Sequence, residues 1–241
     1  MTLLSRSHSR TESERAVPSS TAAAAMLGLI SVALIAAVGY ARPAQQEEVL
    51  ARPVQIGNAS GPAPLEFQGA LMLSGAPGGV ASLQGCPDQP GPTVHPHGKT
   101  LREVLDNITS GNPFYVWGLH DGVINVKPSK GVPALLKAYF EVYDSGETTN
   151  AISAVAYLSS SAVVTSTAAA LGLARSGDIG PGLHAGPQGP ASSPRPLGIQ
   201  LHDVSLVDVL NTVARTNKHG IWIYNETHCG SVHQFGLFFE E

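Results

Sequence analysis

Positive charge and aromatic side chains are scarce in this sequence. Lys and Arg number 14 against 18 Asp and Glu, the formal net charge is -4, and no block of basic residues occurs. Attraction to nucleic acid or to anionic lipid depends on such a block, so we set nucleic-acid binding aside. Aromatic residues make up only 6% of the chain, while Gly and Pro number 26 and 18. This composition predicts modest cores joined by irregular connections.

Cysteine is nearly absent, since Cys86 and Cys229 are the only two. No C-x-x-C pair exists, which removes the commonest zinc and redox motifs. Two cysteines in an oxidising compartment are able to form a disulfide, and the alternative is a pair of free thiols. We predict the Cys86 to Cys229 disulfide, although the sequence does not show whether the geometry permits it.

A single apolar run, Ala22 to Tyr40, is long enough to approach the thickness of a membrane core. Arg6, Arg10 and Arg15 precede it, so the positive-inside rule places the N-terminus in the cytoplasm and the bulk of the chain outside. Gly39-Tyr40-Ala41 is an acceptable cleavage site, which leaves open a membrane anchor or a removable signal. We expect a bacterial single-pass inner-membrane protein with a periplasmic C-terminal region, or a periplasmic protein if the segment is cleaved.

Composition divides the remaining chain into folded parts and connections. Residues 41–92 are rich in Gly, Pro, Ala and Gln, and only Leu65 to Leu73 looks strand-like there. A second Gly/Pro-rich stretch covers residues 177–196. The predicted organisation is a cytoplasmic N-terminus (1–21), a membrane or signal segment (22–40), a linker (41–92), a first module (93–130), a strand plus helix insert (131–176), a linker (177–196) and a second module (197–241).

An internal repeat is the strongest signal in the chain. Thr100 to Leu119 aligns without a gap with Ser205 to Tyr224, and the only two tryptophans, Trp117 and Trp222, fall on one column at an offset of 105 residues. Chance similarity of two amphipathic helices is the alternative. We expect equivalent buried positions for the repeated apolar residues, which include Leu101, Leu105, Trp117, Leu206, Leu210 and Trp222.

Each copy predicts a short helix followed by strands. Thr100 and Ser205 stand at N-cap positions, and apolar residues then recur at the i, i+3, i+4, i+7 spacing of a one-sided helix. Aromatic and β-branched residues follow, and the first copy continues through Asp121-Gly122, a hairpin turn signal. Between the copies, Ala134 to Tyr143 suggests a strand and Thr149 to Leu173 one long helix, with a second membrane span as the alternative. The predicted fold class is α+β.

The pattern resembles the short N-terminal domain (STN) of secretins and TonB-dependent receptors. Thr100 to Ile108, Val116-Trp117 and Asp121 to Pro128 carry the match, with a partial second match from Gly198 to Tyr224. Related modules occur in secretin ring-building domains and in anti-sigma sensor proteins. The chain also resembles bacterial envelope proteins with two such modules around a helical insert, which implies a bacterial source and no particular activity. No plug or sensor-partner sequence accompanies the modules, so transport and secretion are not implied.

Candidate metal and catalytic groups are weakly supported. His219, His228, Cys229 and His233 lie close in sequence near the C-terminus, and such residues bind zinc, but no established ligand motif contains them. Cys229 beside His228 suggests a thiol nucleophile, yet neighbouring residues of a strand point to opposite faces. We therefore predict no catalytic residue, metal site or cofactor.

These observations favour a non-enzymatic envelope protein whose modules mediate protein-protein interaction or assembly. Short sheet edges are expected to accept a strand from a partner protein whose identity the sequence does not reveal. The alternative is a periplasmic metal-binding or thiol enzyme that uses the cluster between His219 and His233. Its metal content would distinguish the two.

Overall fold

The computed structural model describes residues 43–57, 60–86, 91–146, 149–176 and 196–241. The apolar segment Ala22 to Tyr40, the predicted cytoplasmic N-terminus and nearly all of the linker 177–196 lie outside these residues. In the described ranges no single helix is long and apolar enough to span a membrane. Helices α5 (Ala151–Ser160) and α6 (Ala162–Ala170) pass that test only together, with a bend of 47° between them.

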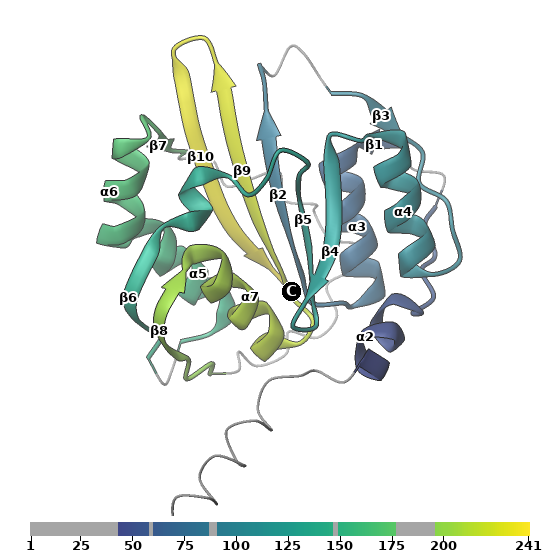
Figure 1. The fold of residues 1–241 in the computed structure, drawn as a ribbon, viewed down its shortest axis with the longest axis horizontal. Coiled ribbons are helices and arrows are strands. Elements are labelled where there is room, and N and C mark those ends of the chain that lie inside the picture. The colour runs from purple at the N-terminus through teal and green to yellow at the C-terminus, as the bar shows by residue number, and fades with distance from the viewer. Residues whose placement is uncertain (1–42, 58–59, 87–90, 147–148, 177–195) are drawn as a thin grey trace, which may run out of the picture. The chain divides into compact units, whose positions relative to one another are not determined.

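The fold is α+β and is built on one mixed sheet of six strands (Figure 1). The strand order is β4-β5-β2-β9-β10-β7, and β2 lies parallel to both of its neighbours. The strands are β2 (Gly78–Gln84), β4 (Tyr115–His120), β5 (Val123–Pro128), β7 (Ala174–Arg175), β9 (Ile221–Cys229) and β10 (Val232–Glu240). Two smaller antiparallel pairs are β1 (Gly61–Pro62) with β3 (Thr93–Val94), and β6 (Tyr139–Asp144) with β8 (Gln200–Ser205).

The repeated sequence forms two equivalent helices, α4 (Leu101–Gly111) and α7 (Leu206–Asn217). Each begins with a complete capping box, in which the Thr100 or Ser205 hydroxyl accepts from the backbone of the third helical residue. The carboxylate of that residue, Glu103 or Asp208, accepts a hydrogen bond from the backbone N-H of the N-cap residue. The four leucines predicted for the core, Leu101, Leu105, Leu206 and Leu210, are fully buried.

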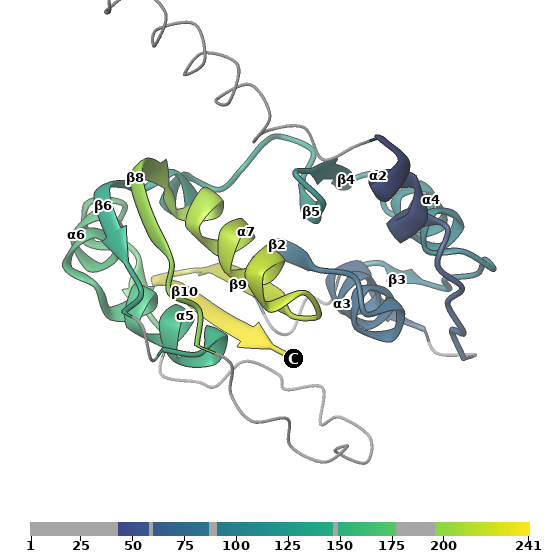
Figure 2. The same cartoon turned by 90° about the horizontal axis from the view of Figure 1, so that it is seen from below.

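Two hydrophobic cores lie on opposite faces of the sheet. Figure 2 shows the two groups of helices that cover them, on different sides of the central strands. Strand β9 contributes Ile221 and Ile223 to one core and Trp222 and Tyr224 to the other, as the alternation of a strand requires. The first core contains α4 and α3 (Ala63–Ser74). The second contains α5, α6, α7 and the 3-10 turn Ala134–Lys137.

The duplication extends over both halves of the described chain, residues 43–130 and 131–241. The order β4-β5-β2 recurs as β9-β10-β7, and every strand of the second set runs opposite to its counterpart. A half-turn about an axis in the sheet, perpendicular to the strands, combined with a shift of three strands along that axis, relates the two sets. Such a rotation exchanges the faces of the sheet, which explains why the two helix groups cover opposite sides.

The prediction of a linker over residues 41–92 is wrong. This segment contains α2 (Pro43–Leu50), α3 and the central strand β2. The stretch read as a strand, Leu65 to Leu73, belongs to α3, which buries Phe67, Ala70 and Leu71 at helical spacing. Its prolines precede the helix or stand in its first turn, where no backbone N-H is needed, so they favour the helix rather than break it.

The region 131–176 is not an insert, because it forms the first part of the second half. Strand β6 pairs with β8 immediately before α7, just as Pro53 bridges to Thr100 before α4. The single long helix predicted from Thr149 to Leu173 is divided at Ser161, whose hydroxyl caps α6 by accepting from the backbone of Val164. Ser161 thus begins a new helix at a different angle. The two halves of the described chain accordingly extend beyond the ranges 93–130 and 197–241 that were predicted for the modules.

Candidate binding site at the sheet edge

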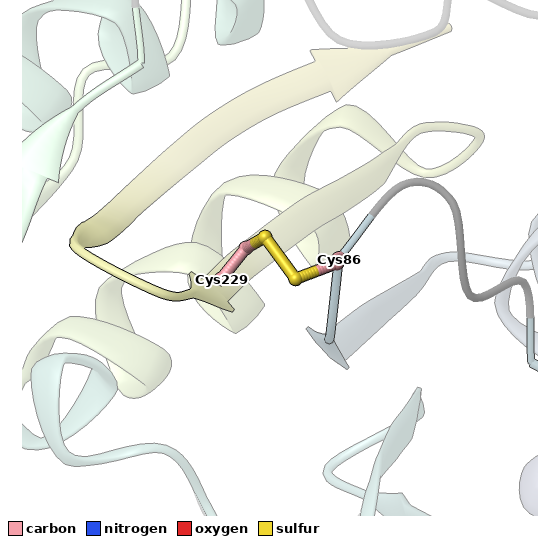
Figure 3. Close-up of a disulfide and its surroundings, with 2 residues drawn as sticks. All are labelled: Cys86 and Cys229. Atoms are coloured by element: carbon pink, nitrogen blue, oxygen red, sulfur yellow. A yellow bond between two sulfur atoms is a disulfide. The ribbon is translucent and has the colours of Figure 1, made fainter.

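The two halves meet where β2 pairs with β9. The parallel register runs from Gly78 opposite Ile221 to Gln84 opposite Thr227. Two residues further along both strands, Cys86 and Cys229 form the expected disulfide, with their Cα atoms 4.6 Å apart (Figure 3). The disulfide therefore joins two residues that are opposite each other in the same β2-β9 register, just beyond the last paired residues.

A glycine opposite a tryptophan shapes this junction. Gly79 lies across from Trp222, and a Cβ atom on Gly79 would come within 1.8 Å of Cε2 of that indole. Trp222 is only 1% exposed, and its Nε1-H donates to Oδ1 of Asn211 at 2.9 Å. The indole thus occupies the space that a side chain on the neighbouring strand would need.

Trp117 occupies the equivalent position in the first half but is not a core residue. Its Nε1-H donates to Oδ1 of Asp106 at 3.0 Å, and Asp106 aligns with Asn211 in the repeat. The expectation of two buried tryptophans fails because Trp117 is only partly buried, with the Arg102 guanidinium 5.9 Å from its ring centre. Strand β4 stands at the end of the sheet, so no strand of the described chain covers this indole as β2 covers Trp222.

The outer edge of β4 presents backbone groups without a strand partner in the described ranges. Asp121 and Gly122 form the two-residue hairpin turn, both with positive φ, which makes His120 and Val123 a hydrogen-bonded pair. Residues alternate along the strand, so the N-H and C=O groups of Trp117 and Leu119 point away from β5. Their counterparts in the repeat, Trp222 and Tyr224, face β2.

The histidine cluster predicted near the C-terminus is assembled only in part. His228 and His233 face each other across the β9-β10 hairpin with their Nδ1 atoms 2.8 Å apart, and Nε2 of His228 lies 2.6 Å from Oε1 of Glu226. His219 precedes β9, at the other end of that strand. Among the described residues, no group of three or more His, Cys, Asp and Glu side chains could hold a metal ion.

The chemical states of Cys229 and Tyr224 affect what this cluster can do. Cys229 is in the disulfide and has no free thiol in this structure. Burial raises the pKa of Tyr224 strongly, and its hydrogen bond to Glu226 raises it further. A neutral phenol therefore donates to Glu226, which in turn orients His228.

A cavity of about 450 Å³ lies beside the disulfide. It is located where β2 and β9 end, next to the start of α3, and its wall includes Gln68 and Tyr115. A second cavity of about 350 Å³ lies between the β4-β5 hairpin and α7. Both touch the junction of the halves.

Sequence reasoning missed β2, and with it Gly79 and Gln68. The available signal was the run Gly78-Gly79-Val80-Ala81, in which small residues precede an apolar stretch and allow close approach of a neighbouring strand. No protein-family model matches the chain, and no significant match was found among curated proteins or solved structures. The roles of these residues therefore follow from their geometry.

Proposed function

We propose that this chain is a non-enzymatic protein of the bacterial cell envelope, whose STN-like modules mediate protein-protein interaction or assembly. The apolar segment Ala22 to Tyr40 would anchor or export it. The resemblance of the repeated helix and hairpin to STN modules supports this proposal, and so does the duplication of the whole arrangement. A disulfide suits an oxidising compartment such as the periplasm.

The open edge of β4 is the observation that carries the proposal. In the second half, the equivalent edge of β9 accepts β2 over seven residues in parallel register. The chain thus contains one completed example of strand addition and one equivalent edge without a strand among the described residues. In strand addition, main-chain hydrogen bonds supply affinity and side-chain pockets supply specificity.

Site-specific cross-linking at β4 tests this proposal. Gly118 is exposed and no atom lies within 4 Å of the position that a Cβ would take there, so a photoreactive phenylalanine analogue fits. In native cells we expect a discrete adduct with an envelope protein from position 118. A matched probe at Tyr157, which is 70% exposed on α5, should give none.

A pair of variants isolates the main-chain contribution. Leu119→Pro removes an outward N-H without removing a bond to β5, whereas Leu119→Ala shortens the side chain and keeps the N-H. The adduct from position 118 should disappear in the first variant and persist in the second. An adduct of equal yield in both, or none from position 118 in the parent, would contradict strand addition at this edge.

Location is tested separately. A reporter that is active only outside the cytoplasm, fused after Glu241, should be active if Ala22 to Tyr40 directs the chain outward. If instead only a reporter that works in the cytoplasm is active in this fusion, the envelope location is wrong. That result would not test whether the β4 edge binds a partner.

The second candidate is a metal-binding enzyme at His219 to His233, since Cys229 is held in the disulfide and provides no free thiol. The Glu226 carboxylate on Nε2 of His228 resembles the contact that supports a metal-binding histidine, but the two Nδ1 atoms, 2.8 Å apart, are in hydrogen-bond contact and would have to separate to bind a metal. Metal analysis of the purified chain distinguishes the candidates. Stoichiometric zinc that is lost in His228→Ala and His233→Ala would favour the enzyme class over our proposal.

A further inference from the structure

The cavity beside the disulfide contains a buried polar side chain whose bonding capacity is unused. Gln68 is only 2% exposed and lines the cavity, yet its amide makes no hydrogen bond within the described residues. Gln68 is not among the described residues with fully enclosed, unpaired side-chain atoms, so its amide is open to the cavity. A ligand there that supplies both a donor and an acceptor would pair with both groups of the amide.

The other polar side chains on the wall, Gln84, Asn112, Tyr115 and Asn225, each make at least one hydrogen bond. Oδ1 of Asn225 accepts from the Ser82 hydroxyl at 2.6 Å, and Oδ1 of Asn112 accepts from the Phe114 backbone at 3.2 Å. The Tyr115 hydroxyl donates to the Leu83 carbonyl at 3.4 Å. Gln68 is therefore the side chain most available to fix the orientation of a ligand.

The surroundings define the chemical class of that ligand. Among the described residues that form the wall, none is Lys, Arg, Asp, Glu or His, so a charged ligand would lose its hydration there without gaining an ionic partner. Pro64, Leu65 and Phe114 supply apolar surface. A side-chain amide pairs with another amide through one donated and one accepted hydrogen bond.

The position of the cavity in the fold is also typical of ligand sites. It lies where the neighbouring parallel strands β2 and β9 end, and α3 starts on its wall without a side-chain cap. In open sheets with parallel strands, ligands bind outside the carboxyl ends of the strands. The volume of about 450 Å³ lies within the usual range for small-molecule sites.

We propose that this cavity binds an uncharged ligand that presents an amide group next to an apolar side chain, with Gln68 pairing to that amide. A capped amino acid and an internal stretch of peptide share this chemistry. The site does not depend on strand addition at β4. Tyr115, the first residue of β4, borders the cavity, but the outer edge at Trp117 and Leu119 does not line it.

Matched compounds test the charge requirement on the full chain in detergent. N-acetyl-leucinamide should raise the melting temperature in a saturable way, because a ligand that binds only the folded state stabilises it. N-acetyl-leucine differs by one carboxylate and should have no effect. Equal shifts by both compounds, or none by the amide up to its solubility limit, would overturn the proposal.

Two variants test the role of Gln68. In Gln68→Leu and in the longer Gln68→Met, the effect of N-acetyl-leucinamide should be lost. Without ligand, each should melt close to the temperature of the parent, because the amide makes no hydrogen bond within the described residues that the substitution could remove. A lower melting temperature in both would show that Gln68 has a structural partner, and a preserved ligand shift would show that it does not bind the amide.

A capped pentapeptide with a central leucine identifies the source of the ligand. If the cavity receives a peptide segment, the pentapeptide should shift the melting temperature at least as much as N-acetyl-leucinamide, and Gln68→Leu should remove both shifts. If only the small compound acts, the ligand is a free small molecule of the same chemistry.

Discussion

The two halves of this chain contain equivalent helices and strands but differ in how the edge of the tryptophan-bearing strand is covered. In the second half, the edge of β9 is covered by β2 and Trp222 is buried; in the first, β4 ends the sheet and Trp117 stays partly exposed. Both indoles donate to the side chain at the same repeat position. The comparison shows that a repeated pattern fixes the local geometry of a tryptophan, whereas the neighbouring strand determines its burial.

The acceptor of each indole reflects this difference. Asp106 is exposed, while the equivalent Asn211 is only 7% exposed. A carboxylate in water retains its hydration, but a buried one without a cationic partner is costly. The covered half therefore has the neutral amide, and the open half has the charged form of the same side-chain shape.

Truncating the two tryptophans should break the comparison most clearly. We expect Trp222→Ala to lower the free energy of unfolding by about 3 to 5 kcal/mol, the scale for a large buried aromatic. Trp117→Ala should cost about 1 kcal/mol, because much of that side chain remains in water. Chemical denaturation of both variants measures the difference, and equal losses would refute the assignment of one core and one surface tryptophan.

Removing the disulfide should be the next largest effect. Cys86 and Cys229 are separated by 143 residues, and their bond fastens the covered edge of β9 to β2, whereas the open edge of β4 has no such bond in the described ranges. The double variant Cys86→Ala, Cys229→Ala should lose about 2 to 4 kcal/mol. Melting curves with and without reductant provide the measurement. A parent protein that reductant does not affect would show that the bond is absent or contributes nothing.

Gly79→Ala should reveal how closely the halves approach. Its Cβ would overlap Trp222, and we expect a loss of about 1 to 3 kcal/mol from overpacking. Gly118→Ala, on the open strand, meets nothing within 4 Å and serves as the matched control. In a Trp222→Ala background the cost of Gly79→Ala should vanish, since the clash is gone. A cost that persists would place its cause elsewhere in β2.

Glu240 offers the smallest effect and a test of pH dependence. It corresponds to Lys127 through the two hairpin registers, and burial raises its pKa above the ordinary 4.5. The folded state then binds the proton more tightly, so stability falls as the pH rises from 4.5 through the folded pKa. Glu240→Gln should remove this slope and raise the melting temperature at pH 7 by about 1 to 2 °C. An unchanged slope would exclude Glu240 as its source.

The sequence predicted the features that depend on local pattern. Helices α4 and α7, their caps, the Asp121-Gly122 turn and the leucine core all follow from spacing within about twenty residues. Strand β2 did not, because GGVASLQ lacks alternation when both faces of a strand are buried. Its role becomes visible only through its pairing with β5 and β9, which are distant in sequence.

The candidate site shows the same limit. The cysteine pair was predictable as a possibility, since only one pairing exists in the chain, and the structure shows it at the end of the β2-β9 register. Gln68 was not, because a glutamine in a helix is ordinarily exposed and nothing nearby in sequence marks it as buried. The sequence led us to expect short sheet edges that are open to a partner strand, but identifying β4 as such an edge required the strand order of the sheet.

Parallel pairing of β2 with β9 imposes an order of events when the chain is made. The first half is complete at Pro128, whereas β9 begins only at Ile221, about 90 residues later. At synthesis rates of about 5 to 20 residues per second, β2 waits roughly 5 to 20 s for its second neighbour. During that interval β2, with its small residues, is an edge strand whose second side is unpaired. Gly78 and Gly79 have no side chains that could pack against a strand of another protein. They therefore reduce incorrect strand pairing until β9, with Trp222, has been synthesised.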